Sequence, residues 1–173
     1  MMRFILSCSL LYLFLVACEG TPEEKPFIPE WTKEQSTTLN ENLSREQDIR
    51  IRLYLEQRKN WDVIDTGSGL RVWVYEDHEG PTAQENDQVD VKFEVRLLND
   101  SLIYKSEEGE LSTFKVDKSD IETGVMEGIK YLSEGDKAKL IVPSHIGHGL
   151  LGDFRKIPPL EVLVIDLELV KIY

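Results

Sequence analysis

The sequence predicts an α+β fold in which an antiparallel sheet of about five strands curls around one short helix. A single helix and a flexible tether are expected before this domain. Two patterns carry the prediction. Several segments alternate apolar and polar side chains, as strands with one covered face do. Residues 121–135 instead repeat apolar side chains at helical spacing between two such segments.

Length and composition define the class of protein. The 173 residues suffice for one domain of about 100 to 110 residues with extensions. Hydrophobic residues make up 41% of the chain, enough for a packed core, and the net charge is −12. An acidic surface repels phosphate backbones, so nucleic acid is not expected as a partner.

The N-terminus reads as a targeting segment. Arg3 precedes a mainly apolar run over residues 4–17, which is shorter than the roughly 20 residues that span a bilayer. The run ends in Leu15-Val16-Ala17-Cys18, which resembles the lipobox of bacterial lipoproteins. We therefore predict a signal peptide over residues 1–17 and a lipid on Cys18. An ordinary signal peptide, or a cysteine there by chance, is the alternative.

A signal peptide followed by a lipidated Cys18 has consequences for the cellular location of the protein and for its cysteines. Acyl chains anchor a protein without a spanning helix, at about 0.8 kcal/mol per buried methylene. The expected location is the bacterial cell envelope, on the inner or outer membrane, facing the periplasm or the surface. Cys8 would leave with the signal and Cys18 would be acylated, so no disulfide is expected. Loss of Arg3 would leave a net charge of −13.

Residues 18–42 are polar and carry three prolines early, a composition typical of a flexible tether. Ser44-Arg45-Glu46-Gln47 then has the spacing of a capping box. It predicts a helix that runs to about Lys59, within a helix-and-connector segment over residues 43–66. Its charges indicate a solvated face, and dimerisation through it is a weaker alternative.

The strands of the domain, residues 67–173, follow from period-two alternation. Asn99-Asp100-Ser101 reads as a turn into a return strand over residues 102–104. Phe114 and Val116 lie on a short strand before the central helix. The apolar sets expected to face the core are Leu70, Val72 and Val74; Val89, Val91, Phe93, Val95 and Leu97; Ala138, Leu140 and Val142; and Leu163, Ile165, Leu167 and Leu169.

The central helix is predicted over residues 121–135. Asp120 or Thr123 can cap its start, and Gly135 can take the left-handed position that closes its end. A weak amphipathic surface helix is the alternative. The residues that share its apolar face are Ile121, Val125, Ile129 and Leu132.

Gly124 and Gly128 lie four residues apart in this helix. Each costs up to about 1 kcal/mol relative to Ala in a helix interior, so helix propensity does not explain them. A stripe without side chains is explained if a sheet must come close to the helix backbone.

Six short motifs of this chain occur in an order and at a spacing that resemble those of the FKBP family, the macrolide-binding peptidyl-prolyl isomerases. The resemblance covers about residues 67–172 and implies an FKBP-like fold. The preceding helix, residues 67–70 and residues 143–145 resemble one branch more closely, the lipid-anchored FKBP-like proteins associated with gliding motility in Bacteroidetes. The motifs are Val91-Lys92-Phe93, Gly124-Val125-Met126-Glu127-Gly128, Gly135-Asp136-Lys137-Ala138-Lys139-Leu140, Gly147-His148-Gly149, Ile157-Pro158-Pro159 and Leu163-Val164-Ile165-Asp166-Leu167-Glu168-Leu169.

The resemblance implies cis-trans isomerisation of Xaa-Pro bonds in exported or envelope proteins, with proline-containing polypeptides as partners. Rotation about the amide faces a barrier of about 18–20 kcal/mol. The twisted transition state is less dipolar than the planar amide, so a dry apolar pocket favours it. This chemistry needs no cofactor and no metal. The alternative is a binding module or chaperone of an envelope machine, without catalysis or with weak catalysis.

The family's site residues carry over to catalytic positions Phe93, Glu122, His148 and Ile165, and to substrate-binding positions Ile103, Tyr104, Phe114, Ile121, Val125 and Ile157. Glu122 stands where a backbone N–H meets the substrate carbonyl, and His148 where the family has a donor tyrosine.

Several of these positions depart from the family pattern. Val125 replaces a tryptophan floor, Ile103 replaces an aromatic, and Ser112 falls near another aromatic position. Tyr104 replaces an aspartate, so a buried carboxylate is expected to be missing. For every such residue, plain core packing is the competing interpretation.

Two other constellations are weak. His145 and His148 with Asp153 could suggest a metal site, but two histidines in a loop with one carboxylate form a poor ligand set. Ser144 beside His145 could suggest a nucleophile, but no elbow motif or orienting acid supports it.

Overall fold

The computed structural model describes residues 32–173. The chain divides into two compact units, residues 1–35 and 36–173, and only residues 32–35 of the first are described. The predicted signal peptide, Cys18 and the tether up to residue 31 lie outside the described residues.

Helix α2 spans Lys33–Glu56 and begins earlier than predicted. The Thr32 N–H donates to Gln35 Oε1 over 2.9 Å, and the Gln35 N–H donates to Thr32 Oγ1 over 3.2 Å. This reciprocal pair is a capping box, and it satisfies N–H groups that a helix start leaves without partners. The predicted start at Ser44 was wrong, because Thr32 and Gln35 have the same spacing. Residues 33–42 of the predicted tether are therefore helical.

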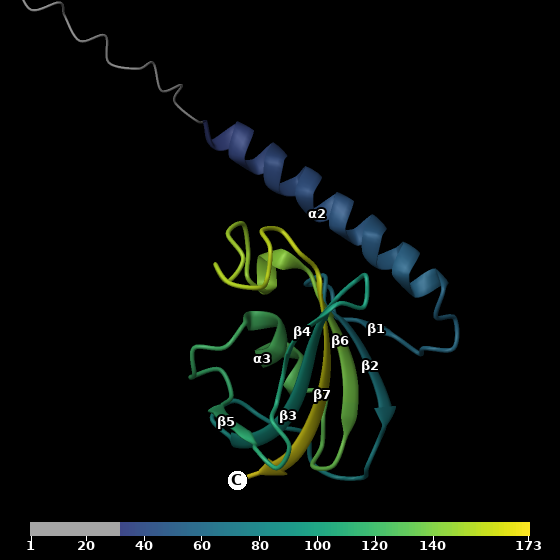
Figure 1. Cartoon of the computed structure of the whole chain (residues 1–173), viewed down its shortest axis with the longest axis vertical. Helices are drawn as coiled ribbons and strands as arrows, with labels where there is room; N and C mark the ends of the chain where they lie inside the picture. The colour runs from purple at the N-terminus through teal and green to yellow at the C-terminus, as the bar shows by residue number, and fades with distance from the viewer. Residues whose placement is uncertain (1–31) are drawn as a thin grey trace, which may run out of the picture. The chain divides into compact units, whose positions relative to one another are not determined.

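One antiparallel sheet of seven strands forms the body of the domain (Figure 1). Its order is β1-β2-β6-β7-β3-β4, and β5 also pairs with β3, along the edge that β3 shares with β4. The two-residue strand β1 is an addition to the predicted set. The strands are β1 Ile64–Asp65, β2 Arg71–Glu76, β3 Gln88–Leu97, β4 Leu102–Lys105, β5 Ser112–Lys115, β6 Lys137–Val142 and β7 Leu163–Ile172. A 3-10 turn, η2, covers Ser144–Ile146.

Strand β3 organises one side of the sheet. One edge pairs with β7 over nine register positions, from Val89↔Ile172 to Leu97↔Leu163. The other edge is divided: Gln88 to Val91 pair with β5, and Glu94 to Arg96 pair with β4. Phe93 lies between these pairings, where its backbone N–H and C=O bond to Ser106. The divided edge places β4 and β5 on either side of Phe93.

Helix α3 is shorter than predicted, Thr123–Ile129. Its N-cap residue is Glu122, which makes no side-chain capping bond, so Asp120 and Thr123 were wrong as caps. Gly135 has a positive φ of 100°, as expected, but it lies in the turn that enters β6 rather than at the helix end. Its N–H donates to the Leu169 carbonyl over 2.7 Å.

The glycine stripe of α3 does face the sheet, as predicted. A Cβ added to Gly124 would lie 2.5 Å from Val142 Cγ1, and one added to Gly128 would lie 2.6 Å from Leu140 Cδ1. Both neighbours belong to β6. The helix backbone therefore lies so close to this strand that no methyl group fits between them at these two positions. The main core, which includes Ile129, Leu132 and Leu167, is packed around this contact.

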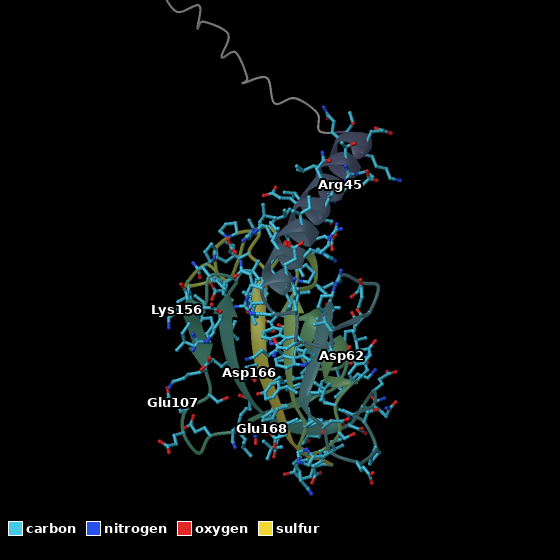
Figure 2. The ribbon with its side chains drawn as sticks, turned by 90° about the vertical axis from the view of Figure 1, so that its right-hand side faces the viewer. Arg45, Asp62, Glu107, Lys156, Asp166 and Glu168 are labelled. Carbon is cyan, nitrogen blue, oxygen red and sulfur yellow. The ribbon has the colours of Figure 1, made fainter. Side chains whose placement is uncertain are left out.

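The outer face of the sheet is only partly open to water. Ile51 and Tyr54 of α2 form a second buried cluster with Ile141, Val162 and Val164. Toward the other end the outer face is charged, and Figure 2 shows Asp166 and Glu168 along β7. The alternation predicted for a sheet with one wet face therefore holds only beyond the reach of α2.

Within residues 32–173, no helix combines the length and the apolar character needed to cross a bilayer.

The glycine stripe yields a stability prediction. We expect Gly124→Ala to lower the free energy of unfolding by about 1–3 kcal/mol, because the new methyl group meets stiff Val142 and the Ile146 carbonyl. Urea unfolding measures this. Gly80→Ala is the control, since its Cβ meets only ordinary contacts with Ser133. Equal stability of wild type and Gly124→Ala would contradict the close-approach account.

Candidate functional site

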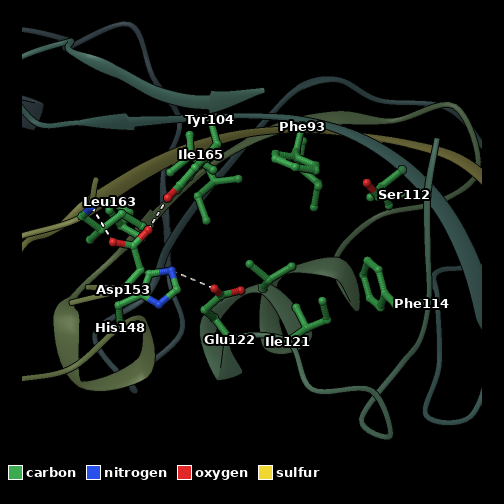
Figure 3. A pocket seen from close by; sticks show the side chains of 15 residues that line it. Phe93, Tyr104, Ser112, Phe114, Ile121, Glu122, His148, Asp153, Leu163 and Ile165 are labelled. Carbon is green, nitrogen blue, oxygen red and sulfur yellow. Dashed lines mark hydrogen bonds and ion pairs between the residues drawn. The ribbon is translucent and has the colours of Figure 1, made fainter. Parts of the chain in front are cut away.

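A pocket of about 300 Å³ lies between α3 and the sheet (Figure 3). It gathers nine of the ten predicted site residues from six separate parts of the chain. Those nine are Phe93, Tyr104, Phe114, Ile121, Glu122, Val125, His148, Ile157 and Ile165; the remaining lining residues are Val91, Val95, Ser112, Asp153, Leu163 and Leu167.

Each wall comes from a different element. Phe93 of β3 and Ile165 of β7 supply the sheet side, and Phe114 stands on β5. Val125 of α3 occupies the floor and is 7% exposed, whereas Ile121 just before the helix is 36% exposed. The pocket is thus mainly apolar, with its aromatic surface supplied by β3, β4 and β5.

Ile103 is the predicted residue that does not line the pocket. Successive side chains of a strand point to opposite faces, and its neighbour Tyr104 takes the pocket side. Ile103 is instead partly buried at the edge of the main core. Ile103 thus lies outside the pocket lining, and its role in substrate contact stays a prediction.

The side chains of Glu122 and His148 contact each other in the pocket. His148 Nε2 lies 2.9 Å from Glu122 Oε1, and both side chains are about 28% exposed. Glu122 is the N-cap of α3, and His148 follows the turn η2 (Figure 3). Among the hydrogen bonds of the described residues, none engages the Glu122 N–H. His148 is therefore held by the side chain of Glu122, and Glu122 is the residue whose backbone N–H was predicted to meet the substrate carbonyl.

A carboxylate lines the pocket after all, and it comes from Asp153. The Tyr104 hydroxyl donates to Asp153 Oδ2 (Figure 3). The backbone N–H groups of Arg155, Lys156 and Ile157 donate to Asp153 Oδ1 over 2.7–2.9 Å. No buried carboxylate stands at position 104, as expected, but Tyr104 reaches across to a half-buried carboxylate on another loop.

These hydrogen bonds shift the pKa values of Asp153 and Tyr104 in opposite directions. Desolvation raises the pKa of Asp153, but the hydrogen bonds from Tyr104 and from the three N–H groups outweigh it and hold this pKa well below its ordinary value. The bond to Asp153, together with desolvation, raises the pKa of Tyr104. At neutral pH the pair is therefore an ionised carboxylate bound by a neutral phenol.

Sequence reasoning missed this partnership because no local pattern connects residues 49 apart. The loop itself does show one signal. Gly152 has a φ of 68°, and a Cβ there would collide with the Ile157 carbonyl oxygen. A glycine beside Asp153 thus permits the tight turn that aims three N–H groups at one carboxylate.

The alternative constellations do not assemble. His145 Nε2 lies 2.8 Å from the Ser68 carbonyl oxygen, away from His148 and its partner Glu122. Ser144 Oγ is buried and accepts a hydrogen bond from Gln47. Within residues 32–173, no group of three His, Cys, Asp or Glu side chains is placed to hold a metal ion.

Known proteins match this chain over the same region. The family model of FKBP-type peptidyl-prolyl cis-trans isomerases matches residues 80–170. A probable FKBP-type peptidyl-prolyl cis-trans isomerase FkpA from Neisseria meningitidis is 33% identical over 110 residues, which cover 64% of this chain and 40% of the relative. The FKBP-type 22 kDa peptidyl-prolyl cis-trans isomerase of Escherichia coli is 31% identical over 121 residues, covering 69% and 58%.

Solved structures agree in fold. The crystal structure of FkpA from Escherichia coli matches with a TM-score of 0.65 and 25% identity, over 80% of this chain and 64% of that one. A peptidyl-prolyl cis-trans isomerase from Pseudomonas syringae matches with a TM-score of 0.62 over 76% and 94%. The chain spans about half the length of the curated relatives it matches.

The Tyr104–Asp153 pair yields a pH prediction. Because the folded pKa of Asp153 is lowered, its contribution to stability is complete above about pH 4 and is lost as pH falls through the folded pKa. Tyr104→Phe removes one donor, so the Asp153 pKa should rise toward its ordinary value. Carboxyl ¹³C NMR titration measures it.

Tyr75→Phe is the matched control, because it removes a different tyrosine–aspartate bond, to Asp166. The control should leave the Asp153 titration unchanged. An Asp153 pKa that is the same in wild type and Tyr104→Phe would show that the phenol does not stabilise the carboxylate.

Proposed function

Because this chain belongs to the family of FKBP-type peptidyl-prolyl cis-trans isomerases, we propose that it catalyses rotation about Xaa-Pro bonds in proline-containing polypeptides. The observation that carries the proposal is the apolar pocket, which unites nine residues predicted from sequence. Its volume of about 300 Å³ is at the small end of ligand pockets, a size suited to a proline ring and its neighbours.

The mechanism rests on differential stabilisation of the twisted amide. Rotation breaks the resonance of the planar peptide, and the twisted state has a smaller dipole to solvate. Transfer from water to a pocket with walls such as Phe93, Phe114 and Ile165 therefore costs the twisted state less than the planar state. Each 1.4 kcal/mol of this difference gives about a tenfold rate increase.

The polar groups have positioning roles in this proposal. The Glu122 N–H, which no hydrogen bond of the described residues engages, is available for the substrate carbonyl. The Glu122 carboxylate orients the His148 ring through Nε2. His148 can therefore donate a hydrogen bond to substrate only in ring orientations that this contact permits. Tyr104 and Asp153 add a second polar pair to the pocket, in which the phenol hydroxyl donates to one carboxylate oxygen.

A second candidate is a non-catalytic or weakly catalytic binding module, such as a chaperone of an envelope machine. Val125 and Ser112 favour it, because a valine floor and a serine wall offer less stacking surface than aromatic residues. Peptide binding without acceleration of isomerisation would distinguish this function from the enzyme.

The finer address is also proposed. The lipobox at Leu15–Cys18 supports a lipid anchor on Cys18 and a place in the bacterial cell envelope, on the inner or outer membrane. The segments Gly67–Leu70 and Pro143–His145 support membership in the gliding-motility branch. In this picture the domain assists folding of exported proteins beside the membrane.

The activity is tested on the full chain in mild detergent with a proline-limited refolding substrate. We expect Phe93→Leu to lower kcat/KM at least about tenfold, because it removes the aromatic wall in contact with proline. Lys92→Gln is the control, since the adjacent side chain pairs with Glu168 on the outer face. No acceleration by wild type would exclude the enzyme and leave the binding module.

The anchor is tested by Cys18→Ser. Wild-type protein should sediment with membranes and carry an acyl mass on its N-terminal peptide, and Cys18→Ser should lose both, because the thiol is the site of lipid attachment. Cys8→Ser should keep both. Acylation that persists in Cys18→Ser would refute the lipobox interpretation; fractionation and mass spectrometry give the readouts.

A further inference from the structure

Helix α2 sends one buried polar side chain into the domain. Gln47 is 4% exposed, and its amide meets Ser144 in both directions. Gln47 Nε2 donates to Ser144 Oγ over 2.7 Å, and the Ser144 N–H donates to Gln47 Oε1 over 2.8 Å. Gln47 Nε2 also lies 3.4 Å from the carbonyl oxygen of Leu160. One amide therefore contacts two points that are distant in sequence.

Those two points are the ends of a single loop. Residues 144–160 leave and re-enter the sheet region between β6 and β7. The Gly149 N–H donates to the Ser144 carbonyl over 2.7 Å, and the Leu160 N–H donates to the Gly149 carbonyl over 3.1 Å. Gln47, Ser144, Gly149 and Leu160 thus form one connected set of hydrogen bonds at the base of the loop.

The same loop carries three walls of the pocket. His148, Asp153 and Ile157 all line it, and none of the three touches α2 through a hydrogen bond of the described residues. Their positions depend on where the base of the loop is held. A displacement of reacting or positioning groups by about 1 Å can cost on the order of a hundredfold in rate.

We infer that Gln47 is a positioning residue, through which α2 fixes the loop of residues 144–160 and so the shape of the proline pocket. The inference rests on the proposed isomerase function. It assigns the helix before the domain a part in the site, although α2 contributes no residue to the pocket lining.

The chemistry requires an amide at this position. Ser144 is 4% exposed, so its N–H and hydroxyl need partners inside the protein. A glutamine side chain supplies a donor and an acceptor at once, which neither a carboxylate nor an apolar residue does. Other links from α2 have different partners: Arg50 Nη2 lies 2.9 Å from Glu161 Oε2, just after the loop, and Ile51 packs on Ile141 and Val164 in the second cluster.

The experiment uses the full chain and two readouts, amide hydrogen exchange and kcat/KM. Gln47→Leu removes both bonds to Ser144 and the contact with the Leu160 carbonyl at similar volume, whereas Ser144→Ala removes only the bond to the Ser144 hydroxyl. Ile51→Val is the matched control, because it weakens α2 packing without touching the loop. Gln47→Leu should speed exchange at the Gly149 and Leu160 amides, leave the Leu140 amide unchanged and lower kcat/KM on the order of tenfold.

Ser144→Ala should give a smaller effect of the same kind, and the double variant should resemble Gln47→Leu alone. Ile51→Val should lower the thermal midpoint while the two loop amides and kcat/KM stay as in wild type. Unchanged exchange at Gly149 and Leu160 in Gln47→Leu would overturn the inference, as would faster exchange with unchanged kcat/KM. If wild type is inactive yet Gln47→Leu frees the loop, the proposed function fails and the control of the loop by Gln47 stands.

Discussion

The close contact between α3 and β6 is the constraint on which the rest of the structure depends. With no side chain at Gly124 and Gly128, the helix backbone lies against Val142 and Leu140, so a seven-residue helix is held by the concave face of one curved sheet. A helix this short has little stability of its own, and tertiary packing must supply what local propensity does not. The approach also sets where Val125 and Glu122 lie, and hence the depth of the pocket.

The remaining walls are supplied by segments that need separate support. β3 divides its outer edge between β4 and β5, so Tyr104 and Phe114 stand on either side of Phe93. The loop after β6 has no sheet partner; it is held through the N–H groups around Asp153 and the amide of Gln47. The pocket walls are therefore held by strand pairing on the sheet side and by hydrogen bonds within and to the loop on the other side.

The long strands, the glycine stripe and the convergence of nine of the ten named residues on one pocket were predictable, because period-two alternation and an ordered set of motifs are properties of the sequence itself. Three features were not. The start of α2 had two equivalent capping boxes, and only the structure distinguishes Thr32 from Ser44. The Tyr104–Asp153 and Gln47–Ser144 contacts join residues 49 and 97 apart, and no spacing rule connects such pairs. Both are polar contacts fixed by tertiary packing.

The central claim is that this pocket binds proline and eases rotation of its peptide bond. NMR exchange spectroscopy of a short Ala-Phe-Pro peptide with the isotope-labelled protein tests both parts at once. The account predicts cis–trans exchange cross-peaks that appear only with protein, together with amide shifts concentrated at Phe93, Glu122 and Ile157. Absence of exchange acceleration, with shifts confined to the outer face around Asp166 and Glu168, would contradict it.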